Sequence, residues 1–367
     1  MQKLKQYKIM NKNYYAVIMA GGVGTRFWPL STHQFPKQFH DMLGTGESLI
    51  QKTFNRFENI IPAENILIAT NKKYENLVLK QLPKTTKNQL LLEPAMRNTA
   101  PCILYSAFKI YNENPDGIIV VAPSDHWIEN EQEFLNNIQT SFNFCENTDA
   151  LLTLGIQPTN PNTGYGYINF TDADDRIKKV KNFTEKPNLE KAKQFLKSGE
   201  YLWNAGIFVW SVKSILKQFE THLPEMYKLF KNGISCYNSP KEESFIEENY
   251  PISQNISIDF GIMEKATNVF VLPVNFDWSD LGTWGSLHSK LNKDKNKNAF
   301  VGGEVIFRDS KNNIVRTQSG KRVVIEGLED FIVVEKEDVL LICPKEREQD
   351  IKEITADVKL KFGKEYI

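Results

Sequence analysis

The stretch AVIMAGGVGTRFWPL, residues 16–30, indicates the fold class of this 367-residue chain. Its apolar start, Ala16–Ala20, is typical of a strand buried on both faces of a sheet. Similar short runs recur at 66–70, 90–93, 118–122 and 151–155. Helical patterns with one apolar face lie between these runs. The alternation predicts an α/β fold with a mostly parallel, mixed sheet covered by helices on both faces.

The composition excludes several classes of protein. Lys and Arg total 45, as do Asp and Glu, so the formal net charge is zero, which argues against a general nucleic-acid or membrane-surface binder. No apolar run approaches the roughly 18 residues of a membrane-spanning helix, and no targeting signal is evident, so we expect a cytoplasmic protein. The four cysteines are far apart and form no C-x-x-C pair, so we expect buried thiols rather than a disulfide or zinc framework.

The pattern of the sequence predicts two domains. A lysine-rich extension, residues 1–12, precedes them, and we expect it to be disordered. A large α/β domain should span 13–290 and include an antiparallel insertion at about 160–212. The polar stretch LNKDKNKN, residues 291–298, marks the boundary. The remaining residues, 298–367, show short β-branched runs broken by turns, and they predict a small all-β domain with a terminal helix that could hold a few solenoid coils.

The loop after the first strand carries the clearest chemical signal. Gly21, Gly22 and Gly24 allow the backbone to approach an anion with its N–H groups exposed. Arg26 and Lys37 add two cations, a combination that suits a polyphosphate. The alternative is a plain glycine turn with solvated basic side chains, which the glycines alone would favour. The sequence has neither a Walker lysine nor the third glycine of the dinucleotide fingerprint.

Eight motifs in order give the chain a family resemblance. They are GGxGTRxxPLS…PKQF from residue 21, EPAMRNTAP (93–101), APSDHWI (122–128), TGYGYI (163–168), FTEKP (183–187), WNAGIFVW (203–210), SIDFGIMEK (257–265) and DWSDLGTW (277–284). Together they resemble sugar-1-phosphate nucleotidyltransferases, specifically the mannose-1-phosphate guanylyltransferases. The resemblance implies a Rossmann-like fold with a C-terminal domain like a left-handed β-helix. It further implies GMP transfer from GTP to mannose 1-phosphate with Mg²⁺, and a homodimer in some members.

The resemblance assigns catalysis to Arg26, Lys37, Asp125 and Asp280, and the metal to the two aspartates. Carboxylates are hard oxygen ligands that suit Mg²⁺. On sequence alone, Asp125 could instead cap a helix at 127–135, and Asp280 could be a turn residue before Gly282.

The resemblance also divides the remaining candidates between two substrates. For the nucleotide they are Gly21, Gly22, Gly24, Thr25, Glu93, Arg97, Asn98 and Thr99. Guanine presents N–H donors, so a carboxylate such as Glu93 is a suitable acceptor. Asn98 or Thr99 could also cap the following helix. For the sugar phosphate the candidates are Gly164, Tyr165, Glu185, Lys186 and Asn204.

Two alternatives to this function stay open. The chain could join another sugar 1-phosphate or another nucleoside triphosphate, such as fucose 1-phosphate or dTTP. It could also be a silent regulatory relative that binds nucleotide sugars, although such relatives tend to lose the metal carboxylates or the loop lysine. The chain leaves no room for the isomerase domain of bifunctional relatives, so we expect transferase activity alone.

Overall fold

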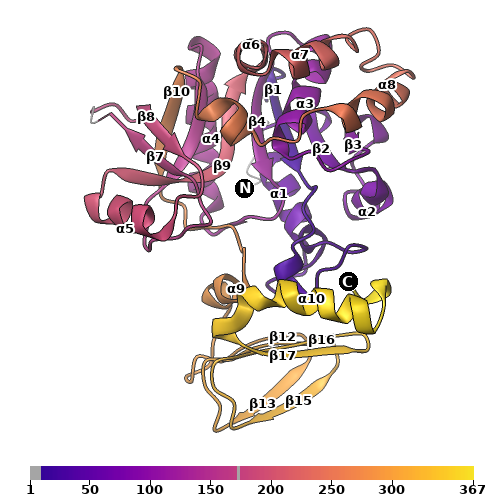
Figure 1. Ribbon diagram of the computed structural model, residues 1–367, viewed down its shortest axis with the longest axis vertical. Coiled ribbons are helices and arrows are strands. Elements are labelled where there is room, and N and C mark those ends of the chain that lie inside the picture. The colour runs from indigo at the N-terminus through magenta and orange to yellow at the C-terminus, as the bar shows by residue number, and fades with distance from the viewer. Residues whose placement is uncertain (1–9, 172–173) are drawn as a thin grey trace, which may run out of the picture. The chain divides into compact units, whose positions relative to one another are not determined.

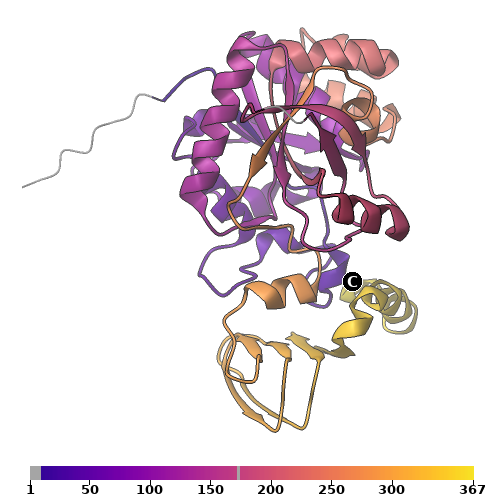
Figure 2. The same cartoon turned by 90° about the vertical axis from the view of Figure 1, so that its left-hand side faces the viewer.

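The computed structural model describes residues 10–171 and 174–367, so residues 1–9 of the predicted extension lie outside the described part. The chain forms two compact units, which Figures 1 and 2 show from two directions. The larger unit contains the residues up to Gly21, Phe54–Pro123 and Ile128–Trp278. The smaller unit contains Gly22–Thr53, Ser124–Trp127 and Ser279–Ile367.

A nine-stranded mixed sheet, in the order β3-β2-β1-β4-β9-β6-β10-β8-β7, forms the centre of the larger unit. β1, β2, β3 and β4 run parallel, β9 runs antiparallel to β4 and β6, and β10 runs parallel to β6. The strands are β1 (Tyr14–Met19), β2 (Ile66–Asn71), β3 (Leu90–Glu93), β4 (Ile118–Pro123), β6 (Leu151–Ile156), β7 (Tyr167–Phe170), β8 (Lys178–Thr184), β9 (Tyr201–Ser211) and β10 (Val269–Val274). The predicted mostly parallel α/β sheet is confirmed.

Helices cover both faces of this sheet, which explains the unbroken apolar runs of its strands. In β1, Tyr15 and Val17 belong to one core cluster with side chains of α3, α6 and α7. Tyr14, one position along, stacks on Phe142 of α4 with ring centroids 4.2 Å apart. Because successive strand residues point to opposite faces, α4 lies on the face opposite α3 (Figures 1 and 2).

The helices of the larger unit are α2 (Glu75–Gln81), α3 (Thr99–Glu113), α4 (Glu131–Asn147), α5 (Leu189–Ser198), α6 (Val212–His222), α7 (Pro224–Lys231) and α8 (Glu242–Asn249). Three of them, α4, α5 and α6, begin with a polar side chain that accepts from a backbone amide of the first turn. The helix considered at 127–135 begins only at Glu131, as α4: Asn130 caps it, its side chain accepting from the Glu133 amide at 3.1 Å. Asp125 is therefore no helix cap.

The segment predicted as an antiparallel insertion is part of the main sheet. β7 and β8 pair with each other at its edge, but β9 lies between β4 and β6. β9 also begins at Tyr201 rather than at Gly206, and Val212 already belongs to α6. The sequence predicted too short a strand here, because polar Asn204 interrupts the run of apolar residues.

The C-terminal part of the smaller unit has stacked β coils, which confirms the predicted β-helix-like domain. Its strands form one sheet in the order β12-β14-β16-β17 and a second that pairs β13 with β15. Their bounds are β12 (Ala299–Val301), β13 (Glu304–Arg308), β14 (Ile314–Arg316), β15 (Arg322–Glu326), β16 (Phe331–Lys336) and β17 (Val339–Pro344). Buried asparagines link the coils: the Asn298 side chain accepts from the Asn313 amide at 3.1 Å, and Asn313 accepts from the Phe331 amide at 2.9 Å.

The core of the smaller unit joins the glycine-rich loop to this β-helix-like part. Phe27 and Trp28 pack in one cluster with Trp284 of α9 (Trp284–Lys290) and with Ile332. Ile351 of α10 (Ile351–Lys361) is buried in the same cluster. Each compact unit is therefore built from segments that are not contiguous in the chain. The predicted sequence domains, 13–290 and 298–367, are contiguous segments, and they stay a prediction.

The remaining elements lie where the chain passes between the units. β5 (Trp127–Ile128), β11 (Trp278–Ser279) and α1 (Leu49–Phe57) each span such a point. The four cysteines carry free thiols, of which Cys102, Cys145 and Cys343 are buried. Across the described ranges, the structure has no helix with both the length and the apolar character needed to cross a membrane.

Candidate active site

Lys37 and two aspartates form a charged cluster within the smaller unit. The Lys37 ammonium lies 2.9 Å from Asp125 Oδ2 and donates to the backbone carbonyl of Asp280 at 2.8 Å. Because both oxygens contact the same nitrogen, Asp125 Oδ2 and the carbonyl oxygen of Asp280 must lie close to each other. The structure therefore brings together the two aspartates that the sequence predicted, although they lie 155 positions apart in the chain.

The glycine-rich loop shapes the position of Lys37. Gly24 has φ 74°, and a Cβ at this position would lie 2.5 Å from Lys37 Cβ. Any other residue would thus be strained and would collide with the lysine stem. The Lys37 side chain is only 4% exposed, and its ammonium lies 5.6 Å from the centre of the Phe27 ring. The loop packs around Lys37 and shields its charged ammonium from water.

The charge of Asp125 is stabilised by this arrangement. Burial by itself would raise the pKa of the Asp125 carboxyl, but attraction to Lys37 and His126 and hydrogen bonding outweigh it, so the pKa is lowered. Asp125 stays ionised at neutral pH and keeps an oxygen donor available for a cation. Asp280 also closes a turn, because its Oδ1 accepts from the Gly282 amide at 3.0 Å. The turn interpretation of Asp280 is thus correct, and it does not conflict with the cluster.

The donor set of this cluster fits a magnesium ion. Asp125 and Asp280 contribute hard carboxylate oxygens, and Mg²⁺ usually takes one or two carboxylates together with substrate phosphates and water. Within 10–171 and 174–367, the structure has no group of three or more His, Cys, Asp or Glu side chains arranged as metal ligands. If the two aspartates hold a metal ion, its remaining ligands would have to come from substrate or water.

The other loop residues of the smaller unit have varied surroundings. Thr25 and Arg26 lie in a single 3-10 turn, Thr25–Phe27, directly after Gly24. The Arg26 side chain donates to Gln349 at 3.0 Å in an exposed position. Its guanidinium is therefore held by a weak neutral contact that a phosphate could replace.

In the larger unit, Glu93 and Gly21 lie next to each other at the carboxyl ends of β3 and β1. A Cβ on Gly21 would lie 3.3 Å from Glu93 Oε2. The Tyr250 hydroxyl, which is fully buried, donates to Glu93 Oε1. Burial raises the pKa of Glu93 to about 7, although the hydrogen bond from Tyr250 opposes this rise. Sequence reasoning missed Tyr250, whose surroundings in the sequence carry no recognisable motif.

Arg97, Asn98 and Thr99 fasten the loop before α3 to residues 251–258. Arg97 donates to the Pro251 carbonyl at 2.8 Å, and Asn98 donates to Asn255 at 2.6 Å. Thr99 Oγ1 accepts from the Ile258 amide at 2.9 Å. Asn98 occupies the cap position of α3, as the sequence suggested, but its side chain makes no capping bond. These contacts are structural, and contact with a nucleotide stays a prediction.

The predicted sugar-phosphate residues also gather in the larger unit. Glu185 Oε1 pairs with the Lys186 ammonium at 2.7 Å, and the backbone N–H of Asn204 donates to the Gly166 carbonyl at 2.8 Å. A Cβ on Gly166 would lie 2.5 Å from Glu185 Oε2, so the glycine makes room for this carboxylate. The ring of Tyr165 packs edge-on against Trp203, with centroids 5.0 Å apart.

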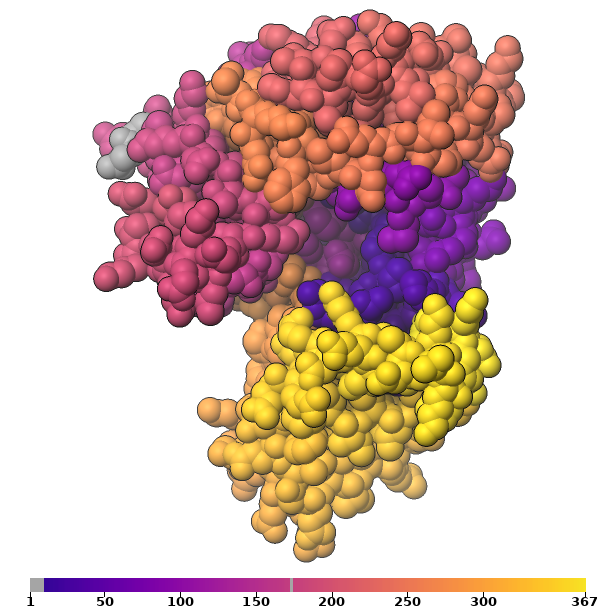
Figure 3. All heavy atoms as spheres, in the orientation of Figure 1, coloured from indigo at the N-terminus to yellow at the C-terminus, as the bar shows by residue number. Residues whose placement is uncertain are grey.

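Gly164 and Asp259 form hydrogen bonds with the side chains of Asn162 and Asn204. The Gly164 amide donates to the Asn162 side chain at 2.8 Å within the same turn. Asp259 accepts from the Asn204 side chain at 3.0 Å. The sequence motif 257–265 contains Asp259, yet it gave this residue no role. Figure 3 shows this face of the larger unit hollowed between the magenta segment around 160–200 and the purple segment around 75–110.

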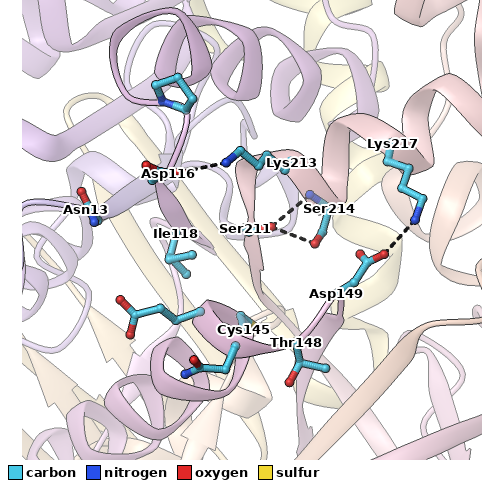
Figure 4. Close-up of a pocket in the computed structure, with 13 residues that line it drawn as sticks. Asn13, Asp116, Ile118, Cys145, Thr148, Asp149, Ser211, Lys213, Ser214 and Lys217 are labelled. Carbon is cyan, nitrogen blue, oxygen red and sulfur yellow. Dashed lines mark hydrogen bonds and ion pairs between the residues drawn. The ribbon is translucent and has the colours of Figure 1, made fainter.

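A cavity of about 550 Å³ lies at the opposite, amino-terminal edge of the sheet (Figure 4). Its charged side chains pair with each other: Lys213 with Asp116 at 2.7 Å, and Lys217 with Asp149 at 2.9 Å. Ligands of open α/β sheets bind at the carboxyl ends of the strands. The cavity is therefore separate from the candidate residues, which follow β1, β3 and β4.

The chain is similar to known proteins in both sequence and structure. The nucleotidyl transferase family matches residues 15–297, and the MannoseP isomerase/GMP-like beta-helix domain matches residues 303–357. Mannose-1-phosphate guanylyltransferase of Escherichia coli is 33% identical over 97% of this chain and 78% of its own length. The enzyme of the same name from Salmonella montevideo is 35% identical over 96% of this chain and 75% of its own length.

A solved structure is similar over nearly the whole chain. It is described as mannose-1-phosphate geranyltransferase from Thermus thermophilus, with a TM-score of 0.85 and 28% sequence identity. The match covers 95% of this chain and 99% of that one. Both the sheet and the β-helix-like part therefore have a counterpart in a single known protein.

Proposed function

Because the chain belongs to the mannose-1-phosphate guanylyltransferase family of nucleotidyl transferases, we propose that it transfers GMP from GTP to α-D-mannose 1-phosphate. The products are GDP-mannose and pyrophosphate. The single observation that supports the chemistry most is the buried Lys37 ammonium on Asp125 and on the Asp280 carbonyl. It provides a fixed cation and two acidic residues in the same unit, as transfer of a charged phosphoryl group requires.

In the proposed reaction, a phosphate oxygen of mannose 1-phosphate attacks the α-phosphorus of GTP. The new oxygen–phosphorus bond forms as the bond from the α-phosphorus to the bridging oxygen breaks, and pyrophosphate leaves with that electron pair. The nucleophile is already an anion, so no residue needs to act as a general base. The protein contributes by positioning the reactants and neutralising their charge.

Lys37 would stabilise negative charge on the transferred phosphate. Its side chain is 4% exposed, so its charge acts with little screening by water. Asp125 and Asp280 would hold Mg²⁺ when it is present. The ion would supply Lewis-acid neutralisation of phosphate charge.

The remaining residues would bind the two substrates. The amides of Gly21, Gly22, Gly24 and Thr25, with Arg26, would hold the β- and γ-phosphates of GTP. Glu93, Arg97, Asn98 and Thr99 would line the nucleotide site, with Glu93 accepting from guanine. Lys186, 60% exposed, would orient the phosphate of the sugar, while Gly164, Tyr165, Glu185 and Asn204 would contact the sugar itself. Pairing of two chains into a homodimer stays a prediction.

The proposal is tested by incubating the purified chain with mannose 1-phosphate, each of the four nucleoside triphosphates and Mg²⁺. We expect GDP-mannose by mass and an equal amount of pyrophosphate, with GTP preferred. A preference for another nucleotide, or for fucose 1-phosphate over mannose 1-phosphate, would reassign the substrates. Absence of pyrophosphate release in all combinations, with nucleotide sugar still bound, would indicate the regulatory alternative.

A further inference from the structure

Asp259 contacts a residue that the sequence predicted to bind the sugar, although no role was predicted for Asp259 itself. It opens a π-helical turn, Asp259–Met263, a rare element that is often found at functional sites. Its Oδ1 accepts a hydrogen bond from Asn204 Nδ2 at 3.0 Å. Asn204 lies on β9 and Asp259 follows α8 far along the chain, so this bond ties two distant segments together at one predicted sugar ligand.

The Asn204 side chain is held from both ends. Its Oδ1 accepts from Thr153 Oγ1 at 2.9 Å and from the Gly206 amide at 3.1 Å, while its Nδ2 donates to Asp259. Rotating the amide by 180° would place Nδ2–H groups against the Gly206 N–H and would lose the bond to Asp259. Asp259 therefore determines which way the one remaining Nδ2–H of Asn204 can point.

A second carboxyl group lies close to Asp259. Burial, followed by repulsion from Glu185, raises the pKa of Asp259 to about 7, and Lys186 opposes this rise. The Glu185 side chain is only 7% exposed and lies against Gly166, and its backbone N–H donates to Glu264 at 3.1 Å. Two acidic groups and one oriented amide thus lie together with limited access to water.

This combination suits neighbouring hydroxyls of a sugar. A hydroxyl donates one hydrogen bond and accepts two, so a carboxylate and an amide N–H side by side can bind two adjacent hydroxyls in a fixed direction. An arrangement that depends on direction discriminates between sugars that differ in one hydroxyl, since the wrong epimer leaves a buried polar group without its partner.

We propose that Asp259 is a positioning residue for sugar recognition, which fixes the Asn204 amide beside the Glu185 carboxylate so that the two bind adjacent hydroxyls of a hexose 1-phosphate. The inference rests on the proposed function, because that proposal assigns Glu185 and Asn204 to the sugar. Asp259 itself acts through Asn204 and not on the reacting phosphates.

The test compares the wild-type chain with Asp259→Leu, which removes the acceptor of the Asn204 Nδ2–H bond, and with Asp259→Asn, which keeps an acceptor oxygen but cannot ionise. Binding of mannose 1-phosphate is measured by calorimetry without GTP, and KM is measured for each substrate. We expect Asp259→Leu to weaken binding of mannose 1-phosphate about tenfold and to leave KM for GTP within about twofold, while Asp259→Asn should have a smaller effect. Discrimination against glucose 1-phosphate, the epimer at carbon 2, should fall as well.

Two further variants separate positioning from general damage. Thr153→Val removes the bond at the other end of the same amide, so it should weaken the sugar phosphate in the same direction, by less. Asp149→Asn removes a carboxyl at the opposite edge of the sheet and should leave both substrates unaffected. Circular dichroism and the midpoint of thermal unfolding establish that each variant is folded.

The pH profile gives a readout that a purely structural role would not change. When Asp259 ionises above about pH 7, it adds a negative charge beside Glu185, which the charge of Lys186 and hydrogen bonds from its own backbone and from Ser257 partly offset. Affinity of the wild type for the anionic sugar phosphate, relative to Asp259→Asn, should fall as pH rises through this range. The ionisation of the ligand is common to both proteins and cancels in the ratio.

The outcomes are distinguishable. If the wild type binds mannose 1-phosphate, and Asp259→Leu binds it equally well and Asp259→Asn shows the same pH dependence, the role of Asp259 is wrong while the proposed function stands. If the wild type neither binds a hexose 1-phosphate nor releases pyrophosphate, both proposals are overturned.

Discussion

Asp125 and Asp259 are two aspartates in acidic clusters, and their environments shift their pKa values in opposite directions. Asp125 faces the Lys37 ammonium at 2.9 Å, and its pKa is lowered despite burial. Asp259 faces Glu185, and burial together with this like charge raises its pKa to about 7. Burial acts on both, so the neighbouring charge decides the protonation state.

This difference matches the chemistry proposed for each cluster. A carboxylate that stays ionised can hold a divalent cation and meet phosphates. A carboxyl group that is close to neutral can lie beside another acid and serve hydrogen bonding to hydroxyls. Pairs of titratable groups with opposed shifts are a known mark of functional sites.

Removing the cation from the first cluster should have the largest effect. Lys37→Ala should lower kcat by about 10²–10³, because it removes a preorganised charge from the transferred phosphate. The pKa of Asp125 should also rise, since the attraction and the hydrogen bond of Lys37 no longer oppose burial, and the acidic limb of the pH–rate profile should move to higher pH. Initial rates of pyrophosphate release between pH 5 and 9 measure both effects.

The control for this variant is Lys321→Ala. Lys321 forms an exposed ion pair with Glu335 at 2.8 Å, so its loss should leave the rate unchanged. A Lys37→Ala rate within a few-fold of wild type would remove Lys37 from the mechanism.

Replacing Asp259 should change the pH dependence of stability. The folded pKa is raised from 3.8 to about 7, so the native state keeps a proton that the unfolded chain has released. Stability therefore falls as pH rises between these values, by an amount whose upper limit is about 4 kcal/mol. Asp259→Asn should lose this decline. Urea unfolding at pH 5 and pH 8 measures the difference between the two proteins.

Asp149→Asn is the matched control, because the pKa of Asp149 is lowered, chiefly by its bond to Lys217. The contribution of Asp149 to stability should be present at neutral pH and be lost on acidification, opposite in sign to that of Asp259. Parallel pH curves for wild type and Asp259→Asn would contradict the assigned environment of Asp259.

Crowding the first cluster through its loop should give an intermediate effect. Gly24→Ala and Gly46→Ala both place alanine at a positive φ, 74° and 89°, which costs roughly 1–2 kcal/mol in each case. Only at Gly24 does the new Cβ meet Lys37, since nothing lies within 4 Å of a Cβ at Gly46. We therefore expect similar losses in thermal stability but a lower kcat for Gly24→Ala alone. Equal rates would show that the loop does not position Lys37.

The smallest effect concerns Glu93, which resembles Asp259 in its raised pKa. Tyr250→Phe removes the hydroxyl that opposes this rise, so KM for GTP near pH 7 should increase about three- to tenfold. The effect should shrink at higher pH, where Glu93 ionises in both proteins. Tyr237→Phe, which loses a buried bond to the Phe230 carbonyl, is the control and should leave KM unchanged.

The fold was largely predictable because it follows from local pattern. Apolar runs such as 118–122 are strands wherever they are buried on both faces, and turn residues between β-branched runs marked the coils after residue 298. The main error concerned β9, whose place between β4 and β6 depends on pairing with residues at least 47 positions earlier in the chain. No local window of sequence contains that information.

The sequence by itself determined which residue types are available: the glycines, cations and carboxylates that a sugar nucleotidyltransferase needs. Only the tertiary structure decided their states. Lys37 comes to lie on Asp125 and Asp280, and Asp259 beside Glu185, through chain reversals that local preferences do not encode. The free energy of a charge depends on what surrounds it within a few ångströms, so identical side chains acquired opposite protonation behaviour only once the chain was folded.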